Sequence, residues 1–343
     1  MLRTATVLAA LGWAGTAQAQ TLTYTFDDAA MSAAGVDSAA IESDLDGALA
    51  GAFDFSSQQQ FLDSMAAAAA IANKGTGVDY ATAPKRFIFG GSLGAGTEGA
   101  GAAFGGKPDD SAAVPLPENG VSVQISLMAG LNLGIATPGE NFLDRLRVFV
   151  NGMSAPLPNG SPFGGNMYNV GAHLQFKMIG QPNPPKIGWG GIDLTTGYEH
   201  STYRLTLSES LPIKDTSGDT TLNWKATGDF AVQADAQSIP VELSTSVRLG
   251  LAALWLGGAV DVNTASASEA ISLGGPIDAD VDGTTVNLGR VELSYDGTGS
   301  ADGITPRVFG GVQANILMFK LYGQLNVGFN DTFGGHTGLR VVL

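Results

Sequence analysis

The chain has 343 residues and a formal net charge of −15, and only 14% of its residues are charged although 44% are hydrophobic. A soluble globular domain carries about 25% charged residues, so this composition disfavours an ordinary soluble enzyme. The acidic balance disfavours nucleic acid as a partner, since phosphate binding needs a basic surface, and the absence of cysteine excludes disulfides and thiol chemistry.

The first 19 residues have the three parts of a secretory signal peptide. Arg3 supplies the basic start, an apolar run extends from Ala5 to Trp13, and Ala17-Gln18-Ala19 is an A-x-A cleavage site. We expect Gln20 to begin the mature chain, which then leaves the cytoplasm. No later apolar run reaches the roughly 18 residues of a membrane helix.

Residues 20–84 form a separate N-terminal segment. A helix is predicted over Ser57–Lys74, because Ser57 and Gln60 form a capping box and Gly75 can adopt the left-handed cap. The segment is either a loosely helical periplasmic tail or a plug. Up to Asn73 it has no Lys or Arg and contains eight acids, which are Asp27, Asp28, Asp37, Glu42, Asp44, Asp46, Asp54 and Asp63.

The clearest strand in the sequence is Val121–Ile135. Its odd positions are apolar and its even positions are polar or glycine, with Met128 as the exception. A strand points successive side chains to opposite faces, so this run has one apolar and one polar face. It exceeds the usual length of about five or six residues and suits a tilted bilayer crossing, which needs about nine to eleven.

Nine further segments repeat this pattern. They are Lys85–Gly96, Phe142–Gly152, Met167–Met178, Gly188–His200, Ile239–Leu251, Leu254–Val262, Arg307–Ile316, Lys320–Phe329 and His336–Leu343. The alternation changes phase near Ser201. Tyr203–Leu207 and Leu222–Ala226 are then either two more wall strands or a hairpin above the membrane. Residues 263–306 are predicted to be mostly loop, with one candidate strand at Val286–Tyr295.

These features predict an all-β fold, a transmembrane antiparallel barrel of about 10–12 strands over residues 85–343. The pattern resembles Gram-negative outer-membrane β-barrel proteins. The segment before the first strand is similar in architecture to the hatch of long-chain fatty-acid transporters, with no shared residue motif. Such barrels usually end in an aromatic residue that the assembly machinery recognises, whereas this chain ends in Leu343. A soluble β-sandwich is the alternative fold, because alternation also builds sandwiches.

The inward positions predict the chemistry of the lumen. A basic collar is expected near the periplasmic mouth, and an acidic N-terminal segment could dock into it because opposite charges attract strongly in a narrow lumen. The alternative is that lumen acids pair with these cations and simply fill a small barrel. The collar residues are Arg86, Arg145, Lys177, Arg248, Lys320 and Arg340, and the other polar lumen residues are Gln124, Asn132, His173, Glu199 and Glu242.

Asp278, Asp280 and Asp282 begin a D-x-D-x-D-G pattern similar to a calcium loop. Position twelve of that loop should be Glu and is Gly289, so an exposed acidic loop is the alternative. No hydrolase or metalloprotease motif is present, and we expect neither an enzyme nor a cofactor.

The sequence therefore predicts an outer-membrane barrel in contact with lipids and with the assembly machinery. Its expected role is a narrow or plugged channel for small solutes or lipidic molecules. The alternative is a closed barrel with a structural or surface-binding role.

Overall fold

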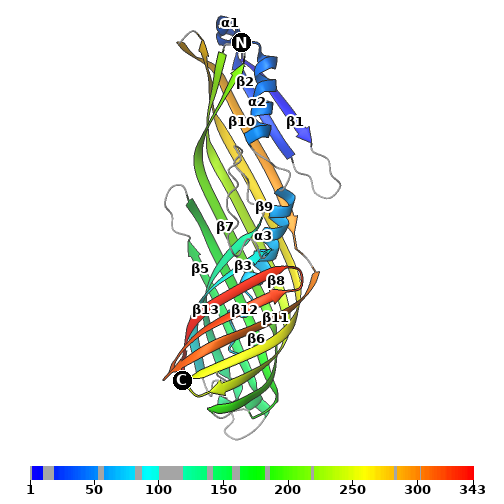
Figure 1. Ribbon diagram of the computed structural model, residues 1–343, viewed down its shortest axis with the longest axis vertical. Helices are drawn as coiled ribbons and strands as arrows, with labels where there is room; N and C mark the ends of the chain where they lie inside the picture. The colour runs from blue at the N-terminus through cyan, green and yellow to red at the C-terminus, as the bar shows by residue number, and fades with distance from the viewer. Residues whose placement is uncertain are drawn as a thin grey trace.

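The computed structural model describes residues 2–10, 19–52, 58–81, 87–99, 119–136, 142–156, 163–181, 186–217, 220–281, 284–301 and 303–343. Within them, ten strands close an antiparallel ring, and neighbours along the chain pair with each other around most of it (Figure 1). The predicted all-β barrel is thereby confirmed, and the number of wall strands lies at the lower end of the expected range.

The ring is built from strands of very unequal length. Pairing of β13 with β3 and of β9 with β8 closes it. In chain order the wall strands are β3 (Phe87–Glu98), β4 (Val121–Asn132), β5 (Leu146–Pro156), β6 (Phe163–Ile179), β7 (Ile187–Ser217), β8 (Thr220–Leu249), β9 (Ala252–Val281), β11 (Gly303–Ile316), β12 (Phe319–Gly328) and β13 (Thr332–Val342).

The two ends of the ring differ. One end, here called the short-turn end, carries the brief connections at residues 250–251 and 317–318 and the end of β13. At the other end, β7, β8 and β9 continue far beyond the ring, and we call this the tall end (Figure 1). Two short 3-10 helices, η2 (Leu133–Ala136) and η3 (Phe142–Arg145), lie between β4 and β5.

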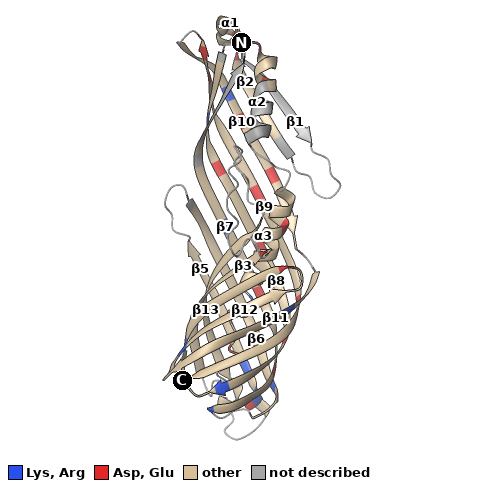
Figure 2. Ribbon diagram, in the orientation of Figure 1, with Lys and Arg blue, Asp and Glu red and all other residues tan. Residues whose placement is uncertain are grey.

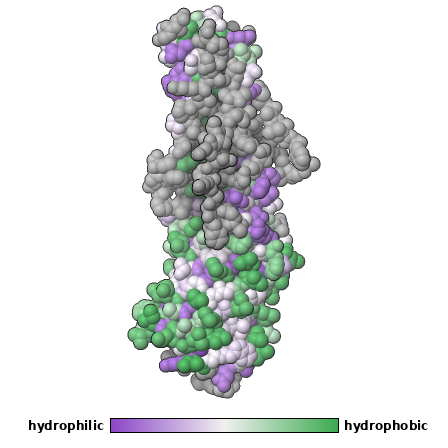
Figure 3. All heavy atoms as spheres, viewed as in Figure 1, coloured by the Kyte–Doolittle hydropathy of each residue, from purple (hydrophilic) through white to green (hydrophobic). Residues whose placement is uncertain are grey.

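Alternation along the wall strands separates a polar interior from an apolar exterior. On β4, Ser122, Gln124 and Ser126 are buried inside, whereas Val121 and Leu127 are about half exposed. On the face seen in Figure 3, hydrophobic residues gather over the outside of the ring. On β8 the apolar outer positions run over residues 239–249. At about 3.3 Å per residue and a tilt of about 40°, these span the roughly 25 Å apolar band of membrane barrels.

The phase change near Ser201 marks the level at which this pattern inverts. Backbone alternation continues without a break across this level of β7, where the inward residue Ser201 is followed by the inward Tyr203. Outside, the apolar row of Tyr198, Ile239 and Val262 is replaced one step higher by polar His200, Gln237 and Thr264. The latter three residues lie in register across β7, β8 and β9.

Above this level the strands therefore have water outside and an apolar core inside. The candidate hairpin at Tyr203–Leu207 and Leu222–Ala226 is the continuation of β7 and β8 above the ring, not two more wall strands. The expectation that residues 263–306 are mostly loop is wrong. β9 continues to Val281, and β10 (Thr284–Ser300) returns beside it.

β10 and β11 occupy one line along β9. Ser300 pairs with Ser266 and Gly303 with Asn263, so the register is conserved across the short interruption between the two strands. The wall at this position is therefore formed by two strands in one line, with β11 in the ring and β10 in the tall end.

The N-terminal part covers the tall end and then descends into the ring. β1 (Leu2–Ala10) pairs with β2 (Ala19–Asp27), and β2 pairs with β10. Helices α1 (Asp28–Ala34) and α2 (Ser38–Ala52) follow, and α3 (Gln58–Ala72) runs down toward the ring. The described helices include none that is long and apolar enough to cross a membrane.

Candidate functional site

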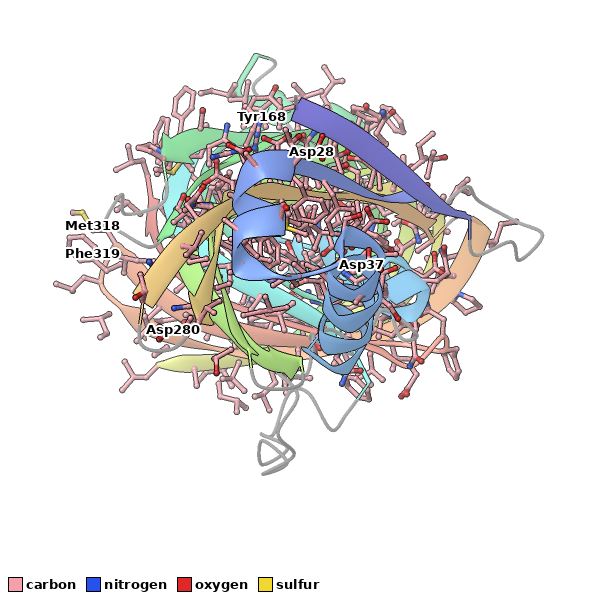
Figure 4. All side chains as sticks on the ribbon, turned by 90° about the horizontal axis from the view of Figure 1, so that it is seen from above. Asp28, Asp37, Tyr168, Asp280, Met318 and Phe319 are labelled. Atoms are coloured by element: carbon pink, nitrogen blue, oxygen red, sulfur yellow. The ribbon has the colours of Figure 1, made fainter. Side chains whose placement is uncertain are left out.

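The interior of the ring is filled by the N-terminal segment. Almost every residue of α3 is buried, and the stretch from Asn73 to Ala81 that follows it is buried as well. Gly75 has a φ of +77°, which confirms the predicted left-handed turn after the helix. We call residues 58–81 the lumen segment. In the view from above, side chains crowd the space enclosed by the strands (Figure 4).

Alanine on the helix and glycine on the wall allow a very close approach. A Cβ added to Gly96 of β3 would lie 2.5 Å from the carbonyl oxygen of Ala68, and one added to Gly94 would lie 2.7 Å from that of Ala72. The same is true on β13, where an added Cβ at Gly334 would lie 2.9 Å from the Ile71 side chain. Glycine at these positions lets the wall touch the helix backbone directly.

Lys74 attaches the lumen segment to the upper wall. Its ammonium lies 3.2 Å from a carboxylate oxygen of Glu199 on β7 and 4.0 Å from Asp261 on β9, and it also donates to the hydroxyl of Ser238. Lys74 is only 1% exposed. A buried cation costs several kcal/mol of desolvation unless it is paired, so this position depends on the wall carboxylates.

A second cluster lies at mid-height. Arg307 on β11 donates to Glu242 at 2.6 Å and to Asp261 at 2.8 Å, and all three side chains are almost fully buried. The hydroxyl of Tyr80, from the lumen segment, donates to the other oxygen of Glu242 at 2.6 Å. Its ring packs against Phe309 with centroids 4.9 Å apart.

A third contact lies toward the short-turn end. Arg340 on β13 donates to the Asp79 carboxylate at 3.2 Å and to the Val78 carbonyl at 2.6 Å. Lys74 and Asp79 are the charged residues of the lumen segment beyond Asp63. They face opposite charges at two levels, so the wall and the segment are electrostatically complementary along the lumen axis.

The predicted lumen residues lie on the inner side of the wall. Gln124, Asn132, His173, Glu199 and Glu242 are each at most 3% exposed. His173 lies 3.7 Å from Glu199, close to the site of Lys74.

The collar residues lie at the short-turn end, where Figure 2 shows most of the visible Lys and Arg. Lys177 pairs with Asp193 at 2.6 Å, and Arg248 and the half-buried Lys320 lie on the inner face. Arg145 is in η3 and not on a strand as predicted, because the chain makes a 3-10 turn before β5, and it donates to the Lys177 carbonyl. Arg86 lies outside the described residues.

The predicted docking of the N-terminal acids into the collar needs correction. The collar meets a single acid of the lumen segment, Asp79, which lies beyond the acidic stretch. Asp28 and Asp37 lie at the tall end, above the middle of the ring (Figure 4). The segment enters the ring from the tall end, so its acids stay at the end opposite the collar. Asp54 falls outside the described residues.

Several lumen residues were not predicted as site residues. Lys74 was assigned to a helix end, and the sequence gives no sign that its partner lies 125 positions away. Arg147, Asp193 and Arg307 are inward on their strands and follow from the alternation rule once the strands are placed. Arg147 lies 3.4 Å from Asp193.

A cavity of about 80 Å³ remains at the upper mouth of the ring. Lys74 and Asp261 form its polar floor, and Ala67, Ala70 and Ile71 of α3 form an apolar side. Polar residues Asn263, Thr305, Asn330 and Thr332 complete the wall. This volume holds several waters or one small molecule, since one water needs about 10–15 Å³ of such space.

The tall end has its own apolar core and one buried carboxylate. The core joins β2, α1, α2, β8, β9 and β10 and includes Tyr24, Trp224 and Val291. Glu269 of β9 lies beneath the start of α3 and accepts a hydrogen bond from the Gln58 amide. Burial raises the pKa of Glu269 to about 8.

The acidic pattern at Asp278 is not in a loop. Asp278 and Asp280 lie on β9, Asp278 forms a 2.7 Å ion pair with Lys225, and Asp282 is outside the described residues. The Lys225 hydrogen bond lowers the pKa of Asp278. No group of three or more His, Cys, Asp or Glu side chains within the described ranges could hold a metal ion. The calcium site therefore stays a prediction that the strand geometry does not support.

Comparison with known proteins identifies a family. The family described as Lsa36-like matches residues 16–343. No protein of curated function matches the chain.

Solved structures that match are bacterial barrels. The outer-membrane protease OmpT from Escherichia coli covers 78% of this chain and all of its own, at 10% identity and a TM-score of 0.38. The toluene transporter TbuX from Ralstonia pickettii covers 82% and 99%, at 9% identity and a TM-score of 0.25. Omp33 from Acinetobacter baumannii covers 76% and 100%, at 11% identity and a TM-score of 0.26. TM-scores this low carry no information on activity or substrate.

Proposed function

We propose that this chain, which belongs to the Lsa36-like family, is an outer-membrane barrel closed by its own lumen segment, and that it acts by presenting its tall end to a partner at the cell surface. In such barrels short turns face the periplasm and long loops face outward. The short-turn end then lies in the periplasm and the tall end outside.

The observation that carries this proposal is the attachment of the lumen segment at several levels. Lys74 pairs with Glu199, Tyr80 hydrogen-bonds Glu242, and Asp79 pairs with Arg340, all in buried positions. Withdrawing the segment would leave Glu199 and Arg340 of the wall without these ion-pair partners, which costs about 3–5 kcal/mol for each broken buried pair. A lumen closed in this way favours a surface role over free passage of solutes, and the role involves no chemical reaction.

The structure outside the ring also supports a surface role. On β8, residues 239–249 are enough to span the apolar band. Residues 220–238 of the same strand continue above it. That extension has its own core and a polar outer face, which are properties of a domain exposed to water. A barrel that served only as a pore would not need it.

Single cysteines test the orientation without background, because the chain has none of its own. We expect Ser38→Cys at the start of α2 to react with a membrane-impermeant maleimide on intact cells. Leu317→Cys, at the short-turn end and 90% exposed, should react only after the outer membrane is opened. Ala68→Cys in the lumen segment should stay unlabelled in both. Labelling of Leu317→Cys, but not Ser38→Cys, on intact cells would contradict the proposal.

A channel that opens on ligand binding is the second candidate, and the cavity at the upper mouth favours it. Its floor contains Lys74 and Asp261, two of the charged groups that attach the lumen segment to the wall. A small polar molecule bound there would compete with this pair and loosen the segment. Conductance that appears only when a solute is added from the tall end would favour the channel over the surface role.

A further inference from the structure

The edge of the tall-end sheet is occupied by a segment that is expected to be removed. β1 consists of residues 2–10, which are the basic start and apolar run of the predicted signal peptide. It pairs antiparallel with β2 from Leu2↔Asp27 to Ala10↔Ala19. Cleavage after Ala19 leaves β2 paired on one side only, with β10.

We propose that the outer edge of β2 is a docking site for an extended segment of a partner polypeptide, which adds to the tall-end sheet as an antiparallel strand. This inference rests on the proposed surface role, and it names the kind of partner that the surface takes. Strand addition uses main-chain hydrogen bonds for affinity and alternate side chains for selectivity.

β2 lacks the features that normally block such an edge. Proteins blunt exposed edges with Lys, Pro, bulges or inward charges. Residues 20–26 read Gln-Thr-Leu-Thr-Tyr-Thr-Phe, with no charge and no proline, and they pair with β10 without a bulge. Threonine and aromatic residues also favour strands. The strand is therefore open to a further partner along its length.

The other edge of the same sheet shows the contrast. The upper part of β7, residues 208–217, has no strand partner besides β8 among the described residues. That stretch contains Pro212, which has no N–H to donate. One edge of the tall-end sheet is thus protected by composition, and the other is protected only while residues 2–10 remain.

A second copy in the same membrane is a poor occupant for geometric reasons. Antiparallel pairing of two β2 strands requires a twofold axis perpendicular to the strands. β2 runs roughly along the length of the molecule (Figure 1), so such an axis would point the two barrels in opposite directions. Parallel pairing about an axis along the strands would place the apolar face of one sheet beside the polar face of the other. A segment of a different chain has neither restriction.

The register defines the chemistry of that segment. Leu22, Tyr24 and Phe26 of β2 point into the tall-end core, whereas Thr21, Thr23 and Thr25 face outward and are partly exposed. A partner strand needs apolar residues opposite Leu22 and Tyr24 and small polar or β-branched residues between them. In β1 these opposite positions are Val7 and Ala5. The exposed Asp27 and the neighbouring Asp28 favour a basic residue at that end, where β1 has Arg3.

A peptide with the sequence of residues 2–10 is the probe for this edge. It is added to the purified mature protein in detergent, and hydrogen exchange is followed by mass spectrometry. We expect the backbone amides of residues 20–27 that point to the free edge of β2 to exchange at least about tenfold more slowly when the peptide is present. A peptide with Ala5→Pro and Thr6→Pro should not protect them. The backbone N–H groups of neighbouring residues in a strand point to opposite edges, so one of the two prolines removes a hydrogen bond to β2.

A matched pair of protein variants separates edge pairing from general peptide binding. Thr23→Lys places a charge beside the edge and should weaken protection at least tenfold. Thr298→Lys, at an exposed position of β10, should leave it unchanged. Protection elsewhere in the chain, or none at β2, would overturn the inference, as would N-terminal sequencing that finds Met1 retained. Whether or not the peptide protects β2, a protein that conducts no ions remains consistent with the proposed closed barrel.

Discussion

The ammonium of Lys74 in the lumen segment lies 3.2 Å from the carboxylate of Glu199 on β7, and both side chains are at least 96% buried. Replacing Lys74 with Met removes the cation and leaves the Glu199 carboxylate buried without its ammonium partner, 3.7 Å from His173. We expect a loss of about 3–5 kcal/mol of stability, the usual cost of breaking a buried pair. Urea unfolding in detergent measures it. Lys320→Met, at a half-buried position whose ammonium donates to the Leu317 carbonyl at 2.8 Å, is the control and should change little.

The wall glycines that face α3 predict a steric effect. Gly96→Ala puts a methyl group 2.5 Å from the Ala68 carbonyl oxygen, so the helix or the strand must move. We expect a destabilisation of about 1–3 kcal/mol, typical of overpacking. Gly258→Ala is the matched control, because its nearest neighbour would be 3.9 Å away. Equal unfolding midpoints for the two variants would show that the helix does not touch the wall at Gly96.

The inversion of polarity at the upper rim predicts where charge is tolerated on the outside. Leu243 of β8 lies within the apolar band and Gln233 lies above it on the same outer face. We expect Leu243→Arg to cost about 2–4 kcal/mol, as lipid-facing arginines do near the bilayer centre. Gln233→Arg should stay within about 0.5 kcal/mol. Folding into lipid vesicles, followed by the heat-dependent shift in gel mobility, distinguishes the two.

Glu269 predicts a loss of stability as the pH rises. Its pKa is about 8 in the folded chain and about 4.3 in an unfolded one. Between these values the folded state holds a proton that the unfolded state has lost, so stability falls through this window and the full cost is present above pH 8. Charging this carboxylate beneath Gln58 should loosen the start of α3.

Glu269→Gln tests this pH dependence directly. The neutral amide removes the titration, so the unfolding midpoint of the variant should stay flat from pH 5 to pH 9 while that of the natural chain falls. Glu292→Gln, at an exposed position of β10, is the control and should retain the slope. A natural chain that gains stability with rising pH over this range would contradict the burial of Glu269.

The ten wall strands could be predicted because lipid outside and polar groups inside require apolar and polar residues to alternate with a period of two. Each strand shows this alternation in its own sequence. The same rule does not place the strands of the tall end. Alternation continues through β7, but its polarity reverses above Ser201 where water replaces lipid, and the sequence shows only a change of phase. The prediction of a loop beyond Asn263 fails for the same reason, since the Ala, Ser and Thr residues of β9 there face a core and water instead of lipid.

The path of the lumen segment could not be read from the sequence. The acidic stretch suggested docking into a basic collar, but the contacts depend on Lys74 and Asp79, single charges in an alanine- and glycine-rich stretch. Their partners lie on β7, β9 and β13, far away in the chain. The glycines on β3 and β13 were the available signal, because a wall position without a side chain allows another backbone to approach.

Ion conductance through the natural chain in planar bilayers tests the central claim, closure of the barrel by residues 58–81, most directly. The closed lumen predicts no stepwise current for the natural chain, and current for a variant in which Lys74→Met and Asp79→Asn remove both charges of the segment that pair with the wall. Steady open-channel current through the natural chain, at the same level as through the double variant, would contradict the claim.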